Sequence, residues 1–316
     1  MQFVTATGPL LERILDGTFT IWSEGLSRPA YSRWNRALME TSWGRARMHR
    51  IALVRGDDVV ASAKRYDFDA RLDGAPVRVL GIGAVFTPPE HRGRGHARAL
   101  IRHLLEDAGR GCGLALLFSE IGPAFYESFG FRVIPREYLT LEPIVKPGAP
   151  AVLVRSAERA DLPAVAGIAA ASARGAAFSL DRSPDSIVFN IARRRLLAGL
   201  GPAGLRQVEF FVTEEGHRAV AYVLLTRGPA GVFLEECGDR DPSGARIGAM
   251  LQVLTARTPA EAPLRVRAWM PASLRPPQLR VLAREPAAEL MMMKVLGPEA
   301  DRVRLEPIIL WQSEVF

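Results

Sequence analysis

The sequence has few of the residues on which several classes of protein depend. It contains two cysteines, Cys112 and Cys237, too few for a disulfide framework or a cysteine-based metal cluster. Its five histidines show no spacing typical of paired metal ligands, so we expect no metal site. No apolar run approaches the roughly eighteen residues that cross a membrane, and the first residues lack the pattern of a secretory signal. We therefore expect a cytoplasmic protein with reduced thiols and no membrane partner.

Lysine is also scarce. Three of the 41 basic residues are lysine and the other 38 are arginine, and the formal net charge is +7. A positive mean field attracts an anionic cofactor and disfavours polycationic acceptors. The arginines are spread along the chain without a basic cluster interleaved with aromatic residues, which argues against nucleic acid as a partner.

The length and the periodicity of the chain favour two domains. It has 316 residues, 48% of them hydrophobic, enough for two ordinary cores. A segment over 143–150, with prolines and a glycine, predicts a linker near the midpoint. The strand and helix patterns before the linker recur in a similar order after it. In the second half they include a predicted short helix near 272–283. The sequence therefore predicts an α/β chain, with a first domain over 1–145 and a second over 150–316.

A basic, glycine-rich loop follows the apolar strand predicted over 76–86. Gly93 and Gly95 allow a tight turn and a close approach of the backbone to a ligand. The helix predicted over 95–108 opens directly from the loop, and a helix N-terminus offers unpaired N–H donors to phosphate oxygens. Arg92 and Arg94 add positive charge at the rim. These residues alone fit either a pyrophosphate site or a turn with solvated arginines, and they match neither a P-loop nor a dinucleotide fingerprint.

A second motif decides between the two readings of the loop. The loop resembles the Arg-x-x-Gly-x-Ala signature of the GNAT acetyltransferase superfamily at Arg92, Gly95 and Ala97. Some thirty residues later, 125–131 resembles the superfamily's aromatic-Tyr-x-x-x-Gly-Phe segment. The resemblance is specific over about 78–132. It implies two tandem folds, each a mixed, mostly antiparallel twisted sheet flanked by helices.

The second half lacks a comparable loop. Over 237–248, Asp239 and Asp241 would repel a pyrophosphate. Tandem copies of which only the first is active resemble Eis-type acetyltransferases, mycothiol synthases and a fungal group of free-lysine acetyltransferases. Eis-type enzymes add a sterol-carrier-like domain for which this chain is too short, so the acceptor and the oligomeric state, a homo-oligomer included, stay open.

The resemblance implies transfer of an acetyl group from acetyl-CoA (coenzyme A) to a primary amine of a small molecule or amino-acid-like acceptor, by direct attack on the thioester. It places the end of the strand, Val85, Phe86 and Thr87, beside the pantetheine arm and the thioester carbonyl. It also implies that the pyrophosphate lies on the loop residues Arg92, Gly93, Arg94, Gly95, His96 and Ala97.

Three residues are candidates for proton transfer. By resemblance, Tyr126 protonates the leaving thiolate, and a phenol is suited to that step. Glu120, at the end of the strand predicted over 113–119, fits either a general base or a surface carboxylate. Eis-type enzymes use the terminal carboxylate of a C-terminal phenylalanine as base, so Phe316 is a second candidate, with a tail packed only for stability as its alternative.

Aromatic and acidic residues near the N-terminus are the candidates for acceptor binding, because together they can bind an ammonium group. These residues are Trp22, Glu24, Tyr31 and Trp34, and about half of them fit the core equally well. Two other functions remain open: a non-catalytic acyl-CoA-binding module, which the intact motif at Tyr126 disfavours, and a tRNA-dependent aminoacyl transferase, which would not need the loop.

Overall fold

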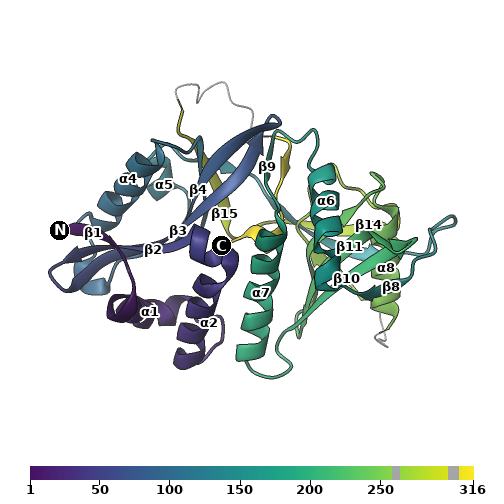
Figure 1. The fold of residues 1–316 in the computed structure, drawn as a ribbon, viewed down its shortest axis with the longest axis horizontal. Coiled ribbons are helices and arrows are strands. Elements are labelled where there is room, and N and C mark those ends of the chain that lie inside the picture. The colour runs from purple at the N-terminus through teal and green to yellow at the C-terminus, as the bar shows by residue number, and fades with distance from the viewer. Residues whose placement is uncertain (258–263, 298–305) are drawn as a thin grey trace.

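The computed structural model describes residues 1–257, 264–297 and 306–316, which form two β-sheets with helices packed against them (Figure 1). Most neighbouring strands are antiparallel, and each sheet also contains a parallel pair. The prediction of two mixed, mostly antiparallel sheets flanked by helices is confirmed. Within the described ranges, no helix is both long and apolar enough to cross a lipid bilayer.

The first sheet has the strand order β1-β2-β3-β4-β5-β15-β6, and β9 pairs with the far part of β3 and carries β16. Its strands are β1 Gln2–Thr5, β2 Met48–Arg55, β3 Asp58–Leu72, β4 Ala75–Phe86, β5 Leu114–Ser119, β6 Arg132–Ile134, β9 Phe178–Leu180, β15 Leu290–Val295 and β16 Ile308–Ile309. The accompanying helices are α1 Gly8–Trp22, α2 Arg28–Glu40, α3 Ser42–Arg47, α4 His96–Ala108 and α5 Ala124–Glu127.

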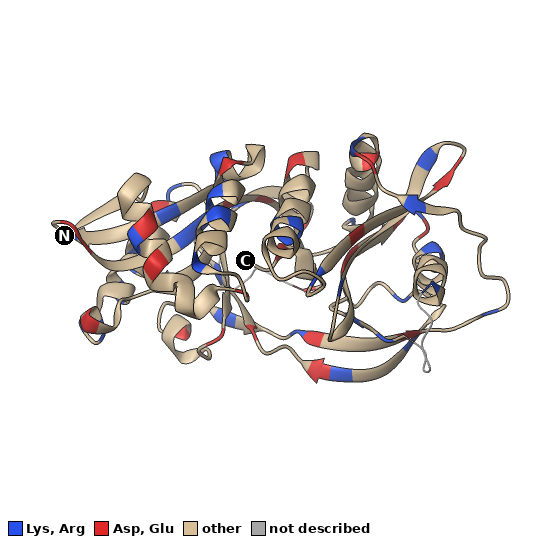
Figure 2. Ribbon diagram, turned by 90° about the horizontal axis from the view of Figure 1, so that it is seen from below, with Lys and Arg blue, Asp and Glu red and all other residues tan. Residues whose placement is uncertain are grey.

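The second sheet has the order β14-β7-β13-β12-β11-β10-β8. Its strands are β7 Glu137–Pro143, β8 Val154–Ser156, β10 Gln207–Glu215, β11 Arg218–Gly228, β12 Gly231–Asp239, β13 Val266–Ala268 and β14 Leu279–Pro286. The helices of this half are α6 Leu162–Ser172, α7 Pro184–Leu200 and α8 Ala245–Ala256. Basic and acidic residues are interspersed over both halves (Figure 2).

The two sheets exchange strands. β7, from the first half of the sequence, lies between β13 and β14 of the second sheet. β15, from near the end of the chain, lies between β5 and β6 of the first sheet. A domain boundary near residue 145 stays a prediction. β7 precedes this position and β15 follows it, and each strand belongs to the sheet formed mainly by the other half of the chain. The exchange places the C-terminal segment against the first sheet.

Helix α7 of the second half packs against α2 and α3 of the first (Figure 1). α2 begins where the Ser27 side chain accepts a hydrogen bond from the Ala30 N–H, and it buries Tyr31, Trp34 and Leu38 along one face. The Trp34 indole N–H donates to the carbonyl of Arg193 on α7 at 3.1 Å. The cavity described below lies beside this junction.

The expected short helix near 272–283 is wrong, because 272–278 form turns and irregular structure and the strand β14 begins at Leu279. Pro276 and Pro277 lack the N–H groups that a helix needs. The residues after them pair antiparallel with β7, so the hydrogen-bonding groups are satisfied across strands instead.

Candidate active site

Strand β4 is distorted at its C-terminal end. Lys64 of β3 pairs with Gly83, whereas Ser62 pairs with Phe86, so β4 holds an extra residue in a bulge. Ala84, within this bulge, has a φ of 46°, in a region that residues with a side chain rarely adopt. Strained backbone of this kind is concentrated at functional sites.

The same end of β4 separates from its parallel neighbour. β4 and β5 pair only from Val79 opposite Leu114 to Ile82 opposite Leu117. Both strands continue beyond these pairs, so their ends diverge. A cavity of about 480 Å³ lies at this divergence, lined in part by Gly83, Ala84 and Val85.

The glycine-rich loop has the conformation that an anion site requires. Gly93 and Gly95 have φ values of 74° and 78°, and α4 begins directly after Gly95 without a side-chain cap. A Cβ atom built on either glycine meets no described atom within 4 Å, so the space in front of the loop is open. The Arg92 Nε donates to the carbonyl of Thr87 at 3.2 Å, which ties the loop to the end of β4.

Side chains around this loop differ in what they offer a ligand. Arg92 and Arg94 are exposed at the rim, and Ala97 is half-buried. The imidazole of His96 is buried, and burial together with nearby Arg55 and His91 lowers its pKa. We therefore assign no ligand contact to that imidazole. Phe86 is also buried and packs near Gly17, so its side chain belongs to the core.

Tyr126 lies on the short helix α5 and lines the cavity. Its ring packs edge-on against Phe125 and Phe131, with centroids 5.0 and 6.2 Å away. Burial raises the pKa of Tyr126 to about 12, so the phenol is a neutral hydrogen-bond donor at physiological pH.

The two sequence motifs are docked onto one another by Arg98 of α4. Its guanidinium lies over the rings of Phe125 and Phe129, at 5.6 and 5.5 Å from their centroids. It also donates to the Ser128 hydroxyl at 3.0 Å. The helix that opens from the loop is thus joined to the segment that carries Tyr126.

The cavity gathers most of the predicted catalytic and acceptor residues. Glu120 lines it but is exposed at the rim. Tyr31 and Trp34 line it while also packing in the core, where they are 2% and 8% exposed. The predicted residues that share this wall are Val85, Glu120, Tyr126, Phe316, Trp22, Glu24, Tyr31 and Trp34.

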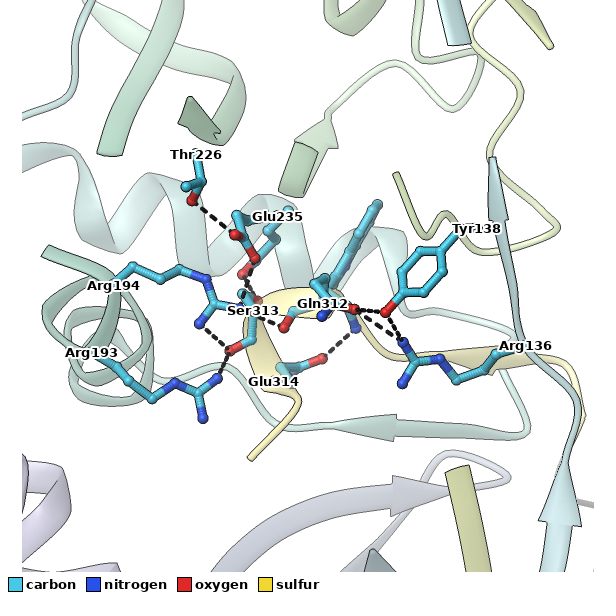
Figure 3. A network of polar contacts seen from close by, with 11 residues as sticks. Arg136, Tyr138, Arg193, Arg194, Thr226, Glu235, Gln312, Ser313 and Glu314 are labelled. Atoms are coloured by element: carbon cyan, nitrogen blue, oxygen red, sulfur yellow. Dashed lines mark hydrogen bonds and ion pairs between the residues drawn. The ribbon is translucent and has the colours of Figure 1, made fainter. Parts of the chain in front are cut away.

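A polar network holds the C-terminal segment in place (Figure 3). The Gln312 side-chain oxygen accepts from Arg136 at 3.0 Å and from the Tyr138 hydroxyl at 3.1 Å. On α7, Arg193 donates to the carbonyl of Ser313 at 2.7 Å, and Arg194 donates to that of Gln312 at 2.6 Å. Residues from both halves of the chain therefore fix this segment.

Buried charged side chains also contact the C-terminal segment. Arg182 lies between two carboxylates, Glu314 at 2.5 Å and Glu236 at 3.5 Å, and all three side chains are less than 5% exposed. The Ser313 hydroxyl donates to Glu236 at 2.7 Å. Burial and the neighbouring Glu236 raise the pKa of Glu314 to about 7, against the opposing effect of Arg182.

Phe316, which follows the residues held by this network, packs against the first sheet. Its ring packs against Tyr66, Phe68 and Phe118, with centroids 4.6, 5.2 and 5.3 Å away. Its main chain lies against Gly83, beside the bulge of β4. The sequence predicted that the apolar tail packs against the protein, but it did not predict that arginines hold it. The run Arg193–Arg195 in a largely apolar helix is the one sequence feature that could have indicated this role.

The corresponding loop in the second half is filled by its own carboxylate. Asp239 accepts hydrogen bonds from the main-chain N–H groups of Asp241 and Arg246, each at 2.9 Å, and from the Arg246 guanidinium at 3.0 Å. These donors lie at the start of α8, where an anion would otherwise bind. Among the described residues, no group of His, Cys, Asp or Glu is arranged to hold a metal ion.

The first half of the chain is similar to a known family. Residues 12–134 match the family model of the acetyltransferase (GNAT) domain. A GCN5-related N-acetyltransferase from Anabaena variabilis superposes with a TM-score of 0.68 at 15% identity, covering 94% of this chain and 73% of that one. No curated protein sequence matched the chain.

Two further solved structures share the fold. Eis1 from Mycobacterium abscessus gives a TM-score of 0.59 at 16% identity and covers 94% of this chain and 74% of its own. N-myristoyltransferase from Saccharomyces cerevisiae, solved with bound myristoyl-CoA, gives 0.54 at 8% identity and covers 98% and 89%. At such identities these structures establish a common fold only.

Proposed function

We propose that this protein transfers an acetyl group from acetyl-CoA to the primary amine of a small acceptor, because residues 12–134 match the GNAT acetyltransferase family model. One observation carries the proposal. The bulged end of β4 and the buried phenol of Tyr126 line one cavity, and the anion loop is joined to both, through Arg92 to the end of β4 and through Arg98 to the segment that carries Tyr126.

The loop supplies the groups that would hold the donor's pyrophosphate. The left-handed glycines leave open space in front of the N-terminus of α4, where main-chain N–H groups lack intrahelical acceptors. Arg92 and Arg94 are exposed at the rim, and the guanidinium nitrogens of Arg92 other than the Nε that donates to Thr87 can still reach phosphate oxygens. Bound here, the donor supplies the acetyl group as an activated thioester carbonyl.

Val85 is the residue of the strand end that we assign to the developing oxyanion. It lines the cavity, whereas the Phe86 side chain packs in the core and the Thr87 carbonyl accepts from Arg92. A preorganised main-chain N–H aimed at the carbonyl oxygen stabilises the charge that forms during attack. The bulge at Ala84 turns this part of the strand away from ladder pairing.

Tyr126 acts on the leaving sulfur chiefly as a hydrogen-bond donor. Its pKa of about 12 lies well above that of an ordinary thiol, near 8.5, so complete proton transfer to a thiolate is uphill by about 5 kcal/mol. A hydrogen bond from the neutral phenol stabilises the thiolate without that cost.

Two carboxylates compete for the role of base toward the amine. Glu120 lies at the exposed rim, and Phe316 lies against Gly83, beside the bulge. A carboxylate is present at Phe316 only if the protein ends there. A variant with one added C-terminal residue therefore separates the two candidates, because it removes a terminal carboxylate from this position and leaves Glu120 intact.

The acceptor would enter beside Trp22, Glu24, Tyr31 and Trp34, which line the same cavity. The test is a screen of primary amines for release of the CoA thiol, with thermal unfolding followed in parallel. Turnover with at least one amine and stabilisation by acetyl-CoA are expected. Stabilisation without turnover on any amine would favour a non-catalytic acyl-CoA-binding module, and the absence of both would overturn the proposal.

A further inference from the structure

The cavity wall contains four acidic and four basic side chains, but not all of them pair with one another, and the acidic Glu120 is exposed. Glu24 pairs with Arg206 at 3.5 Å, and Glu235 pairs with Arg194 at 2.7 Å. Glu289 lies 3.1 Å from the Tyr138 hydroxyl, whose single hydrogen is shared between Glu289 and Gln312. Glu24 and Glu235 are therefore paired with cations of this wall.

Two cations of the same wall have no such partner. Among the residues that the structure describes, neither Lys64 nor Arg193 forms an ion pair with a carboxylate. The Lys64 ammonium lies 5.5 Å from the ring centroid of Trp34, and Arg193 donates to the neutral carbonyl of Ser313. Both side chains line the cavity.

The surroundings add to this positive charge. Arg50 of β2 is 2% exposed, has one nitrogen without a hydrogen-bond partner, and lies near Lys64. Burial, Arg50 and Arg193 together hold the pKa of Lys64 well below its usual range, and Glu24 only partly opposes them. Burial also lowers the pKa of Arg193 to about 10. An anion delivered by a ligand would relieve this unfavourable arrangement of like charges.

Lys64 is also close to the place of reaction. It is the direct cross-strand partner of Gly83, next to the bulge at Ala84 and the main chain of Phe316. Directly paired residues have Cβ positions about 5 Å apart. An anion bound by Lys64 therefore lies within the span of one small molecule from an amine that attacks beside Val85.

We propose that the acceptor is a small amine that also carries a carboxylate, bound by Lys64 and Arg193 while the amine faces the bulged end of β4. The inference rests on the proposed acetyl transfer and names its substrate class. It also accounts for the two cations of this wall that pair with no described carboxylate, at a site where an acceptor with several positive charges would be repelled.

The test compares amino acids of increasing length with their carboxamides, each pair sharing the same amine. The wild-type protein should favour the carboxylate member of at least one pair by about ten-fold or more in kcat/KM. Lys64→Met keeps the length of the side chain and removes its charge, so it should abolish that preference by raising KM for the carboxylate alone. Arg195→Gln, at an exposed position on the same helix, is the matched control and should behave as wild type.

Two outcomes would overturn the inference while leaving acetyl transfer intact: equal use of both members of every pair, or an equal loss for both in Lys64→Met. Calorimetric binding of the preferred amino acid without acetyl-CoA gives a readout that is independent of turnover, and Lys64→Met should weaken it. If no amine is acetylated, the proposed acetyl transfer is wrong. If, in addition, calorimetry detects no binding of any amino acid, the proposed carboxylate site is wrong as well.

Discussion

The main-chain oxygen of Phe316 lies 3.3 Å from the position that a Cβ atom on Gly83 would occupy. The end of the chain and the bulged end of β4 are thus in contact, with room for a glycine and little more. The exchange of β7 and β15 makes this contact possible, since it brings the last described segment to the first sheet. A residue at position 316 is therefore part of the candidate active site although the motifs lie almost two hundred residues earlier.

Gly83→Ala tests whether this contact matters for turnover. The added methyl group must move Phe316 by a few tenths of an ångström, so we expect kcat to fall while acetyl-CoA still stabilises the protein. Deleting Val315 and Phe316 should also lower kcat, and in that shortened chain Gly83→Ala should have no additional effect on it. Full activity of the shortened chain would remove Phe316 from the mechanism.

Gly95→Glu tests the anion loop. The substitution places a carboxylate in the open space before α4, at a φ of 78° that disfavours any side chain. We expect it to abolish thermal stabilisation by acetyl-CoA. Gly148→Glu is the control, because Gly148 has a similar φ of 74° and equally open surroundings but lies in the segment between the halves. Its intrinsic cost in stability should be similar and its response to acetyl-CoA unchanged.

Tyr126→Phe removes the phenol and keeps the ring that packs on Phe125 and Phe131. Loss of one positioned donor or acid typically costs about 10²-fold in rate, so kcat should fall by that order with acetyl-CoA affinity nearly constant. Since the pKa of Tyr126 is about 12, the wild-type rate should show no loss from phenol ionisation below about pH 10. Unchanged turnover in the variant would exclude Tyr126 from the reaction.

Local signals predicted the strand, loop and helix of the site well. The sequence predicted a strand over 76–86 from its apolar residues and a helix over 95–108 from the glycines before it and its apolar residues at helical spacing. The structure has β4 over Ala75–Phe86 and α4 over His96–Ala108. Each signal is contained within a few neighbouring residues. The strand exchange is different, because the partners of β7 and β15 lie more than a hundred residues away and several apolar strands offer similar patterns.

Other parts of the site had too little local pattern to be predicted. Strand β9 has three residues, too few to show an alternation, and it went unpredicted. The bulge at Ala84 directly follows Gly83, and a glycine inside a strand pattern fits either a bulge or a close approach of another segment. The arginines of α7 resembled a solvated charge run, and only the tertiary structure shows that Arg193 and Arg194 hold the tail.

Glu314 should make stability fall as pH rises toward neutrality. Its pKa is raised from 4.5 to about 7 in the folded protein, so between these values the folded state binds more protons than the unfolded state. This contribution is complete below about pH 4.5 and is lost as pH rises through 7, with a size of up to about 3 kcal/mol. The physical reason is the burial of Glu314, to which the neighbouring carboxylate of Glu236 adds; protonation removes a buried charge that Arg182 compensates only in part.

Glu314→Gln should remove that component, because a neutral amide leaves Arg182 with one carboxylate, Glu236, at every pH. Denaturant unfolding of both proteins from pH 4.5 to 7.5 measures the effect as the difference between the two free-energy curves. That difference should change with pH across the window, in favour of the variant as pH rises. A constant difference would mean that Glu314 stays ionised throughout and that Arg182 alone compensates both carboxylates.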